Sequence, residues 1–298
     1  MKPDLNDFND FIRILLASGF SIGGGKDEGV YAIVNFDWLN VPLGSPIVWH
    51  TGDLETDPWE WRIRVLNERD DIAYAKCFFR KSGYITREFY PYFLVLRRGG
   101  GDFGCGEGTL SRGGGGFGCG EGTLHRGGND QSCEEWDSRR EVRTFNVGEC
   151  ANSRGGYARR QSIADFDDDY ADGKISHYAK RIYETVCERG ELPLQDIKTF
   201  GGFRREEKSK FDSALTELQM RMYLTICGTR RRMNAKGEEY GWESTMFCTT
   251  EKFWEHTDVF DIAAKLDESD AFSAIRERVL MLNPNADDKK IHMFAYGE

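Results

Sequence analysis

The sequence lacks the long apolar segments of membrane proteins and the paired cysteines of metal-binding knuckles. No run approaches the roughly 18 apolar residues of a membrane span, and the first residues show no Lys- or Arg-led apolar segment. No C-x-x-C pair occurs, and four of the eight cysteines stand alone in apolar, periodic segments: Cys77, Cys187, Cys227 and Cys248. We therefore expect reduced thiols in a soluble, cytoplasmic protein.

Basic residues are fewer than acidic residues over the whole chain. The 298 residues carry a formal net charge of -10, which argues against a protein that coats nucleic acid with its entire surface. Apolar residues make up 39% and aromatic residues 13%, enough to build the packed core of one large or two ordinary domains. Any site for nucleic acid must therefore be a local basic surface.

A glycine-rich repeat interrupts the middle of the chain. The eight residues "FGCGEGTL" begin at Phe103 and again at Phe117, and glycine fills about half of the positions from 99 to 128. Two copies of a 14-residue unit are too few to bury a shared core, so we expect residues 99–156 to form a flexible insert. The flanking segments join well without it.

Three functional interpretations of this insert are weaker. A phosphate loop would need a following lysine and a helix, and neither pattern is present. Four cysteines could bind zinc, but 13, 13 and 16 residues separate them: Cys105, Cys119, Cys133 and Cys150. Acidic residues dilute the Arg-Gly-Gly motifs that would bind RNA. We predict no metal site and no cofactor.

In residues 176–250, apolar residues first recur at the spacing of helices and then alternate as in strands. Ser176 can cap a helix that ends before Gly190, Pro193 opens a short second helix, and a third helix runs from about Arg205 to Gln219. The strand patterns "MRMYLTICG" and "STMFCTT" then flank a polar excursion. Three helices followed by a hairpin are typical of a winged helix-turn-helix.

The charge of this segment favours contact with nucleic acid. Residues 203–236 contain nine Lys or Arg and four Asp or Glu, a local balance of +5. Seven of the basic residues gather at the start of the third helix and at the expected hairpin tip: Arg204, Arg205, Lys208, Lys210, Arg230, Arg231 and Arg232. A winged helix touches DNA with these two elements, and Ser213 and Thr216 would add polar contacts from the third helix. A winged helix used only for protein contacts is the alternative.

The candidate catalytic residues lie in the segment before the helix that Pro58 is expected to open. Asp57 can act as the N-cap of that helix. His50 and Asp53 stand beside several tryptophans that could stack on a base, and Asp53 could activate water for base excision. The plain alternative is that this cluster only caps and packs the helix. Farther along, "IAYAKCFF-RKSG-YIT" predicts a hairpin that turns at "RKSG".

Five stretches resemble a known family: "WHTGDLETDPWEWR", "IAYAKCFFRKSGYITREFYPYF", "FDDDYADGKIS", "LTELQMRMYL" and "NAKGEEYGW". They are similar to the bacterial AlkZ-related proteins, distant relatives of the AlkZ/YcaQ winged-helix DNA glycosylases, over about residues 49–98 and 157–256. The resemblance implies an array of winged helices. Through the more distant glycosylases, it also implies excision of alkylated or crosslinked bases. The catalytic Gln-x-Gln or Gln-x-Asp pair of those glycosylases is absent before residue 150, where the nearest analogue is Asn35-Phe36-Asp37.

Together these observations predict a helix-rich α+β protein with tandem winged helix-turn-helix modules. The expected divisions are an N-terminal winged-helix-like region, the insert, a winged-helix module and C-terminal helices: residues 1–98, 99–156, 157–256 and 257–298. The expected function is binding of double-stranded DNA, in damage recognition. An active base-excision glycosylase and a winged helix for protein contacts stay open as alternatives.

Overall fold

A computed structural model describes residues 4–98, 166–233 and 239–298, so the predicted insert lies outside the described residues. The strands are β1 (Phe20–Ile22), β2 (Ile72–Phe78), β3 (Lys81–Thr86), β4 (Leu192–Pro193), β5 (Leu224–Met233) and β6 (Glu239–Thr249). The first helices are α1 (Phe8–Ser18), α2 (Pro58–Glu68), α3 (Tyr90–Arg98), α4 (Phe166–Ala171), α5 (His177–Arg189) and α6 (Leu194–Phe200). A 3-10 turn (Arg205–Glu207) precedes α7 (Lys208–Met220), α8 (Thr250–Phe253), α9 (Val259–Ala263), α10 (Glu268–Leu282) and α11 (Asp288–Tyr296).

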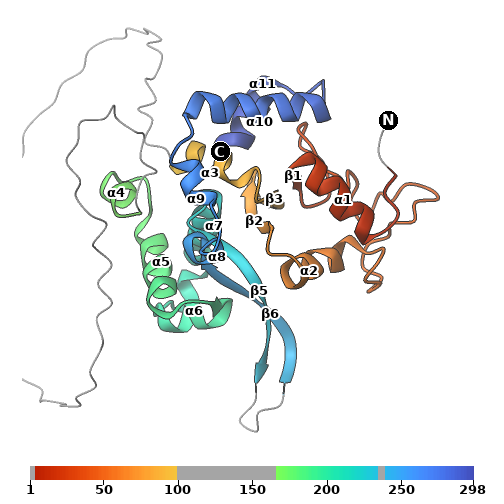
Figure 1. Ribbon diagram of the computed structural model, residues 1–298. Helices are drawn as coiled ribbons and strands as arrows, with labels where there is room; N and C mark the ends of the chain where they lie inside the picture. Colours follow the sequence, from red (N-terminus) through yellow and green to blue (C-terminus); the bar gives the residue numbers. More distant parts are fainter. Residues whose placement is uncertain (1–3, 99–165, 234–238) are drawn as a thin grey trace, which may run out of the picture. The chain divides into compact units, whose positions relative to one another are not determined.

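Helices surround one antiparallel sheet, so the predicted α+β class is confirmed (Figure 1). The strand order is β1-β3-β2-β5-β6-β4, and Tyr74 of β2 pairs with Ile226 of β5 at the centre. None of the helices in the described ranges is long and apolar enough to cross a membrane.

The sheet has two halves with a similar order of elements, although the second half has one more helix before its hairpin. In the first half (residues 8–86), α1 and β1 precede α2 and the β2–β3 hairpin, and β1 pairs with β3. In the second half (residues 177–249), α5 and β4 precede α6, α7 and the β5–β6 hairpin, and β4 pairs with β6. The leading strands of the two hairpins therefore meet at the centre of the sheet.

One helix of each half packs against a strand of the other half. The α2 helix packs against β5, and α7 packs against β2. The Gln219 side chain of α7 is only 2% exposed, and its Oε1 accepts a hydrogen bond from the Lys76 backbone N–H at 3.0 Å. This N–H lies where the pairing of β2 with β3 shifts register, so the amide satisfies a donor at the irregularity.

The β2–β3 hairpin turns earlier than the sequence predicts. The expected turn at "RKSG" is wrong, because the two residues between the strands are Phe79 and Arg80, both with positive φ (49° and 61°). Gly83 lies inside β3, where an added Cβ would come within 2.3 Å of the Phe78 ring. This glycine therefore allows close packing within the hairpin instead of forming its turn.

The helices of the second half agree closely with the sequence prediction. Ser176 is the N-cap of α5, accepting a hydrogen bond from the Ala179 N–H, and α5 ends at Arg189. Pro193 belongs to the short strand β4, and α6 begins one residue later. The strands β5 and β6 are longer than expected, since their pairing continues to Met233 opposite Glu239.

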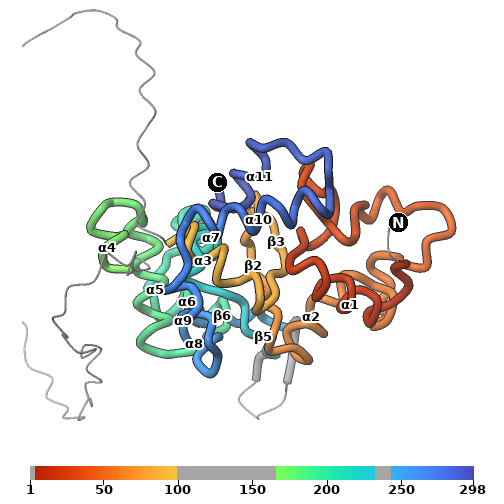
Figure 2. The backbone as a smooth tube through the Cα atoms, turned by 45° about the horizontal axis from the view of Figure 1, so that its top comes forward, coloured from red at the N-terminus to blue at the C-terminus, as the bar shows by residue number. Residues whose placement is uncertain are grey.

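The C-terminal helices cover one face of the first half. The apolar side chains of α3, α9, α10 and α11 pack with Phe20, Ile22 and Phe78 in one buried cluster. Figure 2 shows the blue C-terminal tube beside the red and orange N-terminal tube, and the Arg278 guanidinium donates to the Ala17 carbonyl at 2.6 Å. The helix α11 was not predicted, although Asp287 caps it by accepting from the Lys289 N–H at 3.0 Å.

Candidate nucleic-acid interface

An open groove lies between α7 and the β2–β3 hairpin. Its volume is about 580 Å³, and its lining comes from both halves of the sheet: Lys76 and Arg80 of the hairpin region, and Lys208, Ser209, Asp212, Ser213 and Thr216 of α7. We call this site the α7 groove. It exists because α7 of the second half packs on β2 of the first half, so neither half builds it alone.

Helix periodicity decides which face of α7 lines the groove. The buried stripe of the helix consists of Phe211, Ala214, Leu215 and Leu218. Side chains three and four residues apart share a helix face, which leaves Lys208, Ser209, Asp212 and Ser213 exposed beside that stripe. The predicted contacts Lys208 and Ser213 therefore lie on the exposed face, as expected.

The hairpin contributes two basic side chains to the groove. Lys76 is the one exposed residue within the otherwise buried β2. Arg80 is exposed at the tip, where its left-handed backbone is unusual for a residue other than glycine. Neither residue was predicted, because the local excess of basic residues in the sequence lies in the second half, at residues 203–236. The exposed lysine in a buried strand was the available signal.

The groove is electropositive in its lining. Three of its seven residues are basic and one, Asp212, is acidic. The Asp212 carboxylate lies 3.7 Å from the Lys198 Nζ, which offsets its charge. Closely spaced cations in an open, solvated concavity attract phosphate groups.

The other predicted residues at the start of α7 are exposed. Arg204 and Arg205 lie in the turn before the helix, and the Arg204 backbone N–H donates to Glu207 Oε2 at 2.8 Å. This hydrogen bond lowers the pKa of Glu207, with a further contribution from Arg181. The Lys210 ammonium donates to the Tyr178 hydroxyl at 3.1 Å, which raises the pKa of Lys210. Lys210 is thus held against α5 and is not among the groove residues.

Thr216 is less available than the sequence suggests. Its side chain is 8% exposed, and its hydroxyl donates to the Asp212 backbone carbonyl at 2.9 Å. Thr216 lines the groove, but this hydrogen bond already uses its hydroxyl proton. Ser213 lies on the same helix and is exposed, so its hydroxyl is more accessible than that of Thr216.

The predicted wing arginines lie within a strand. Arg230 and Arg231 are exposed residues of β5, and Arg230 and Arg232 pair with Ser244 and Tyr240 of β6. The expected position at the hairpin tip was therefore wrong, because the strands continue past the arginines. Arg231 Nε lies 3.5 Å from a Glu243 carboxylate oxygen.

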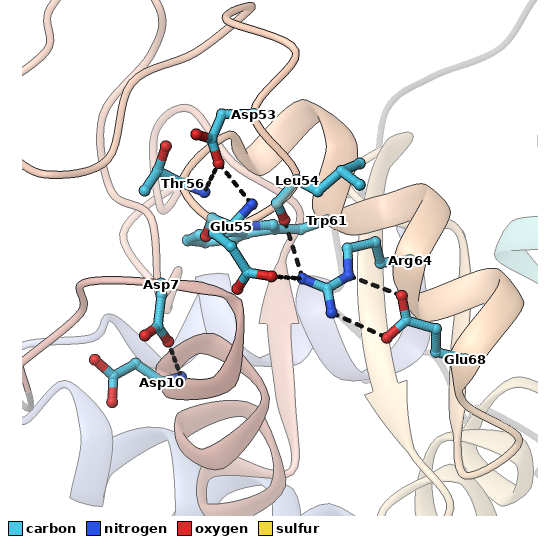
Figure 3. A network of polar contacts seen from close by, with 9 residues as sticks. All are labelled: Asp7, Asp10, Asp53, Leu54, Glu55, Thr56, Trp61, Arg64 and Glu68. Carbon is cyan, nitrogen blue, oxygen red and sulfur yellow. Dashed lines mark hydrogen bonds and ion pairs between the residues drawn. The ribbon is translucent and has the colours of Figure 1, made fainter.

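The candidate catalytic residue Asp53 lies in a network of polar contacts ahead of and along α2 (Figure 3). Asp53 Oδ1 accepts hydrogen bonds from the Glu55 and Thr56 backbone N–H groups at 2.8 and 3.1 Å. The Arg64 guanidinium donates to the Leu54 carbonyl at 3.1 Å and to Glu55 Oε1 at 3.0 Å. These contacts fix the turn that contains Asp53.

Asp57 and His50 have structural partners too. Asp57 is buried and caps α2 as predicted, accepting from the Trp59 N–H at 2.8 Å. His50 is exposed, has a φ of 59°, and contacts the Trp59 ring with centroids 5.1 Å apart. Neither His50 nor Asp53 lines the α7 groove or the cavity beside α10 and α11.

The described ranges hold no cluster of three or more His, Cys, Asp or Glu side chains suited to a metal ion. Compared with known protein families, the chain matches a family model described as AlkZ related, over residues 5–106 and 156–295. No curated protein and no solved structure matches the chain. The matched residues include both sides of the α7 groove.

Proposed function

The chain belongs to the AlkZ-related family, and we propose that it binds double-stranded DNA with two winged-helix modules, in the recognition of damaged DNA. The order of elements supports the modules. Each half of the sheet places a helix before a hairpin, and its short strand pairs with the last hairpin strand. In a winged helix, the helix before the hairpin enters the major groove and the hairpin lies on the backbone.

The observation that carries the proposal is the basic lining of the α7 groove. Lys208 comes from the helix that a winged helix inserts into DNA, while Lys76 and Arg80 come from the hairpin region of the other half. A duplex held by α7 would therefore bring its phosphates toward the β2–β3 hairpin. The groove would thus join one helix and one hairpin in a single surface for DNA.

The role of each side chain depends on its chemistry. Lys76, Arg80 and Lys208 would neutralise phosphates, which positions the duplex without reading its sequence. Ser213 is exposed on the α7 face and would contact base edges through its hydroxyl. Arg230 would add a phosphate contact from the β5–β6 hairpin.

The surroundings of Asp53 give no support for base excision. Asp53 uses Oδ1 to hold its own turn and lies outside the α7 groove, so its surroundings favour the capping role over the activation of water. The family relationship makes base release worth measuring, but no described residue supports it specifically.

One experiment separates these functions. Binding of a plain duplex of about 20 base pairs and of methylated and crosslinked duplexes is measured by fluorescence anisotropy, and released base is recorded on the same samples. We expect salt-sensitive binding to every duplex, tighter on damaged DNA, and weaker binding by the variant Lys76→Ala/Arg80→Ala/Lys208→Ala. A parent protein without affinity for any duplex would refute the proposal and favour a winged helix for protein contacts. Base release would add an enzyme activity to it.

A further inference from the structure

Large apolar side chains are exposed mainly in one segment of the first half. Six of the ten exposed large hydrophobic residues in the described ranges fall between positions 38 and 59: Trp38, Leu39, Leu43, Val48, Leu54 and Trp59. We call these six side chains the 38–59 surface. Scattered exposed apolar residues are ordinary, whereas several of them in one segment make that segment a candidate interaction site.

Aromatic contacts join two members of this surface. Trp38 is 61% exposed and Trp59 is 43% exposed, and the His50 ring lies between them with centroid distances of 6.3 and 5.1 Å. The Arg62 guanidinium covers one face of Trp59 at 3.6 Å from the ring centroid. Two large side chains from distant positions are thus presented together with a histidine between them.

Hydrogen bonds hold the backbone of the segment in place. Asp37 Oδ1 accepts from the Leu39 N–H at 3.1 Å and from the Asn40 Nδ2 at 2.7 Å. The Val48 N–H donates to the Thr56 carbonyl at 3.2 Å, and Asp57 Oδ2 accepts from the Gly52 N–H at 3.0 Å. Because these hydrogen bonds already order the backbone, the segment would lose little conformational entropy when a partner binds.

The charge around this surface indicates which kind of partner would bind. Residues 35–60 contain no lysine or arginine, and four of their acidic side chains are exposed or half-buried: Asp37, Asp53, Glu55 and Glu60. Two arginines border the surface, since Arg62 covers Trp59 and Arg64 pairs with Glu55, so carboxylates remain in excess. Phosphates would be repelled here, which disfavours nucleic acid, and a second copy of the same acidic surface would be repelled as well. Lysine or arginine beside apolar side chains would be complementary to it.

We propose that the 38–59 surface docks a segment of another protein that presents apolar side chains next to lysine or arginine. The apolar side chains would cover Trp38 and the leucines, and the cationic groups would meet the surrounding carboxylates. This interaction is separate from DNA binding, since the surface shares no residue with the α7 groove. One molecule could therefore hold DNA and a protein partner at once.

The test uses a defined probe with the full chain. A labelled helical peptide of leucine and lysine is titrated by fluorescence anisotropy, beside a peptide in which serine replaces every leucine. The double variant Trp38→Ser/Leu43→Ser removes exposed apolar area, and Ile262→Ser/Met281→Ser is the matched control at exposed positions elsewhere. Thermal midpoints verify that all variants are folded.

We expect the Leu/Lys peptide to bind the parent and the control equally, and to bind the Trp38/Leu43 variant at least about tenfold more weakly, a change of about 1.4 kcal/mol. The Ser/Lys peptide should also bind at least about tenfold more weakly. Equal binding of the two peptides, or of the parent and the Trp38/Leu43 variant, would overturn the proposal. So would binding of a short oligothymidylate, or self-association in sedimentation, that the Trp38/Leu43 substitutions abolish.

Discussion

Both halves of the sheet place a helix and a short strand ahead of a hairpin, but they differ in what lies between the short strand and the hairpin. In the first half, the described residues 23–57 form neither helix nor strand before α2 begins. In the second half, α6 comes directly after β4, and a short turn leads into α7. The first half thus carries an irregular acidic and apolar surface, and the second half carries a compact basic helix.

This difference suggests a division of labour on one framework. Under the two proposals, the second half would provide the helix for DNA, and the first half would provide the 38–59 surface for protein and the hairpin that completes the α7 groove. A shared architecture therefore does not imply a shared role, because each role depends on the side chains that each half exposes.

The largest effect is expected from breaking the contacts by which Arg97 of α3 joins α11 to α7 of the second half. This buried guanidinium donates to the carbonyl of Met220 at 2.9 Å and to those of Phe294 and Ala295 at 2.9 and 3.1 Å. The substitution Arg97→Met leaves these carbonyls unsatisfied and should cost about 3 to 5 kcal/mol, which lowers the thermal midpoint by roughly 10 °C.

Calorimetry measures this effect, with Arg87→Met as the control. Arg87 forms an exposed ion pair with Asp258, so its loss should cost less than about 1 kcal/mol. Similar midpoints for the two variants would mean that Arg97 does not join the C-terminal helices to α7.

A smaller effect is expected from Gly83→Ala in the first half. Its new Cβ would lie 2.3 Å from the Phe78 ring and 3.0 Å from the Ser21 carbonyl oxygen, which forces the strands or the ring to move. We expect a loss of about 1 to 3 kcal/mol from overpacking, measured by denaturant unfolding. Lys81→Ala, at an exposed position of the same strand, should change the free energy of unfolding by about 0.5 kcal/mol or less. Equal losses in the free energy of unfolding for the two variants would show that Gly83 has no special packing role.

The hairpin of the second half should contribute modestly to DNA binding. Replacing Arg230, Arg231 and Arg232 with Ala would lower the slope of log affinity against log salt by about 2.7 if each met a phosphate. We expect about 0.9 to 1.8, because the Glu243 carboxylate near Arg231 partly neutralises that arginine. The loss should be similar on unrelated duplexes. A slope equal to that of the parent would exclude this hairpin from the interface.

The smallest effect is expected at Asp53. Asparagine retains the oxygen that accepts from Glu55 and Thr56, so Asp53→Asn should leave DNA affinity and the thermal midpoint nearly unchanged. If the parent releases damaged bases and this variant does not, the structural interpretation of Asp53 is wrong. An amide cannot accept the proton that activation of water requires.

The sequence was most informative where local chemistry decides the structure. The caps at Ser176 and Asp57 and the stripe of α7 depend on rules that act within a few residues, and all three are confirmed. The α7 groove could not be predicted in the same way. It depends on the pairing of Tyr74 with Ile226, a contact between distant strands that no local pattern encodes.

The salt dependence of duplex binding tests the central claim most directly. The variant Lys76→Ala/Arg80→Ala/Lys208→Ala removes three cations of the α7 groove, and Lys26→Ala/Lys265→Ala/Lys289→Ala removes three exposed lysines elsewhere, so the net charge changes equally. We predict that the slope of log affinity against log salt falls by up to about 2.7 in the groove variant and stays at the parent value in the control. An unchanged slope in the groove variant, or an equal fall in the control, would contradict the assignment of DNA binding to this groove.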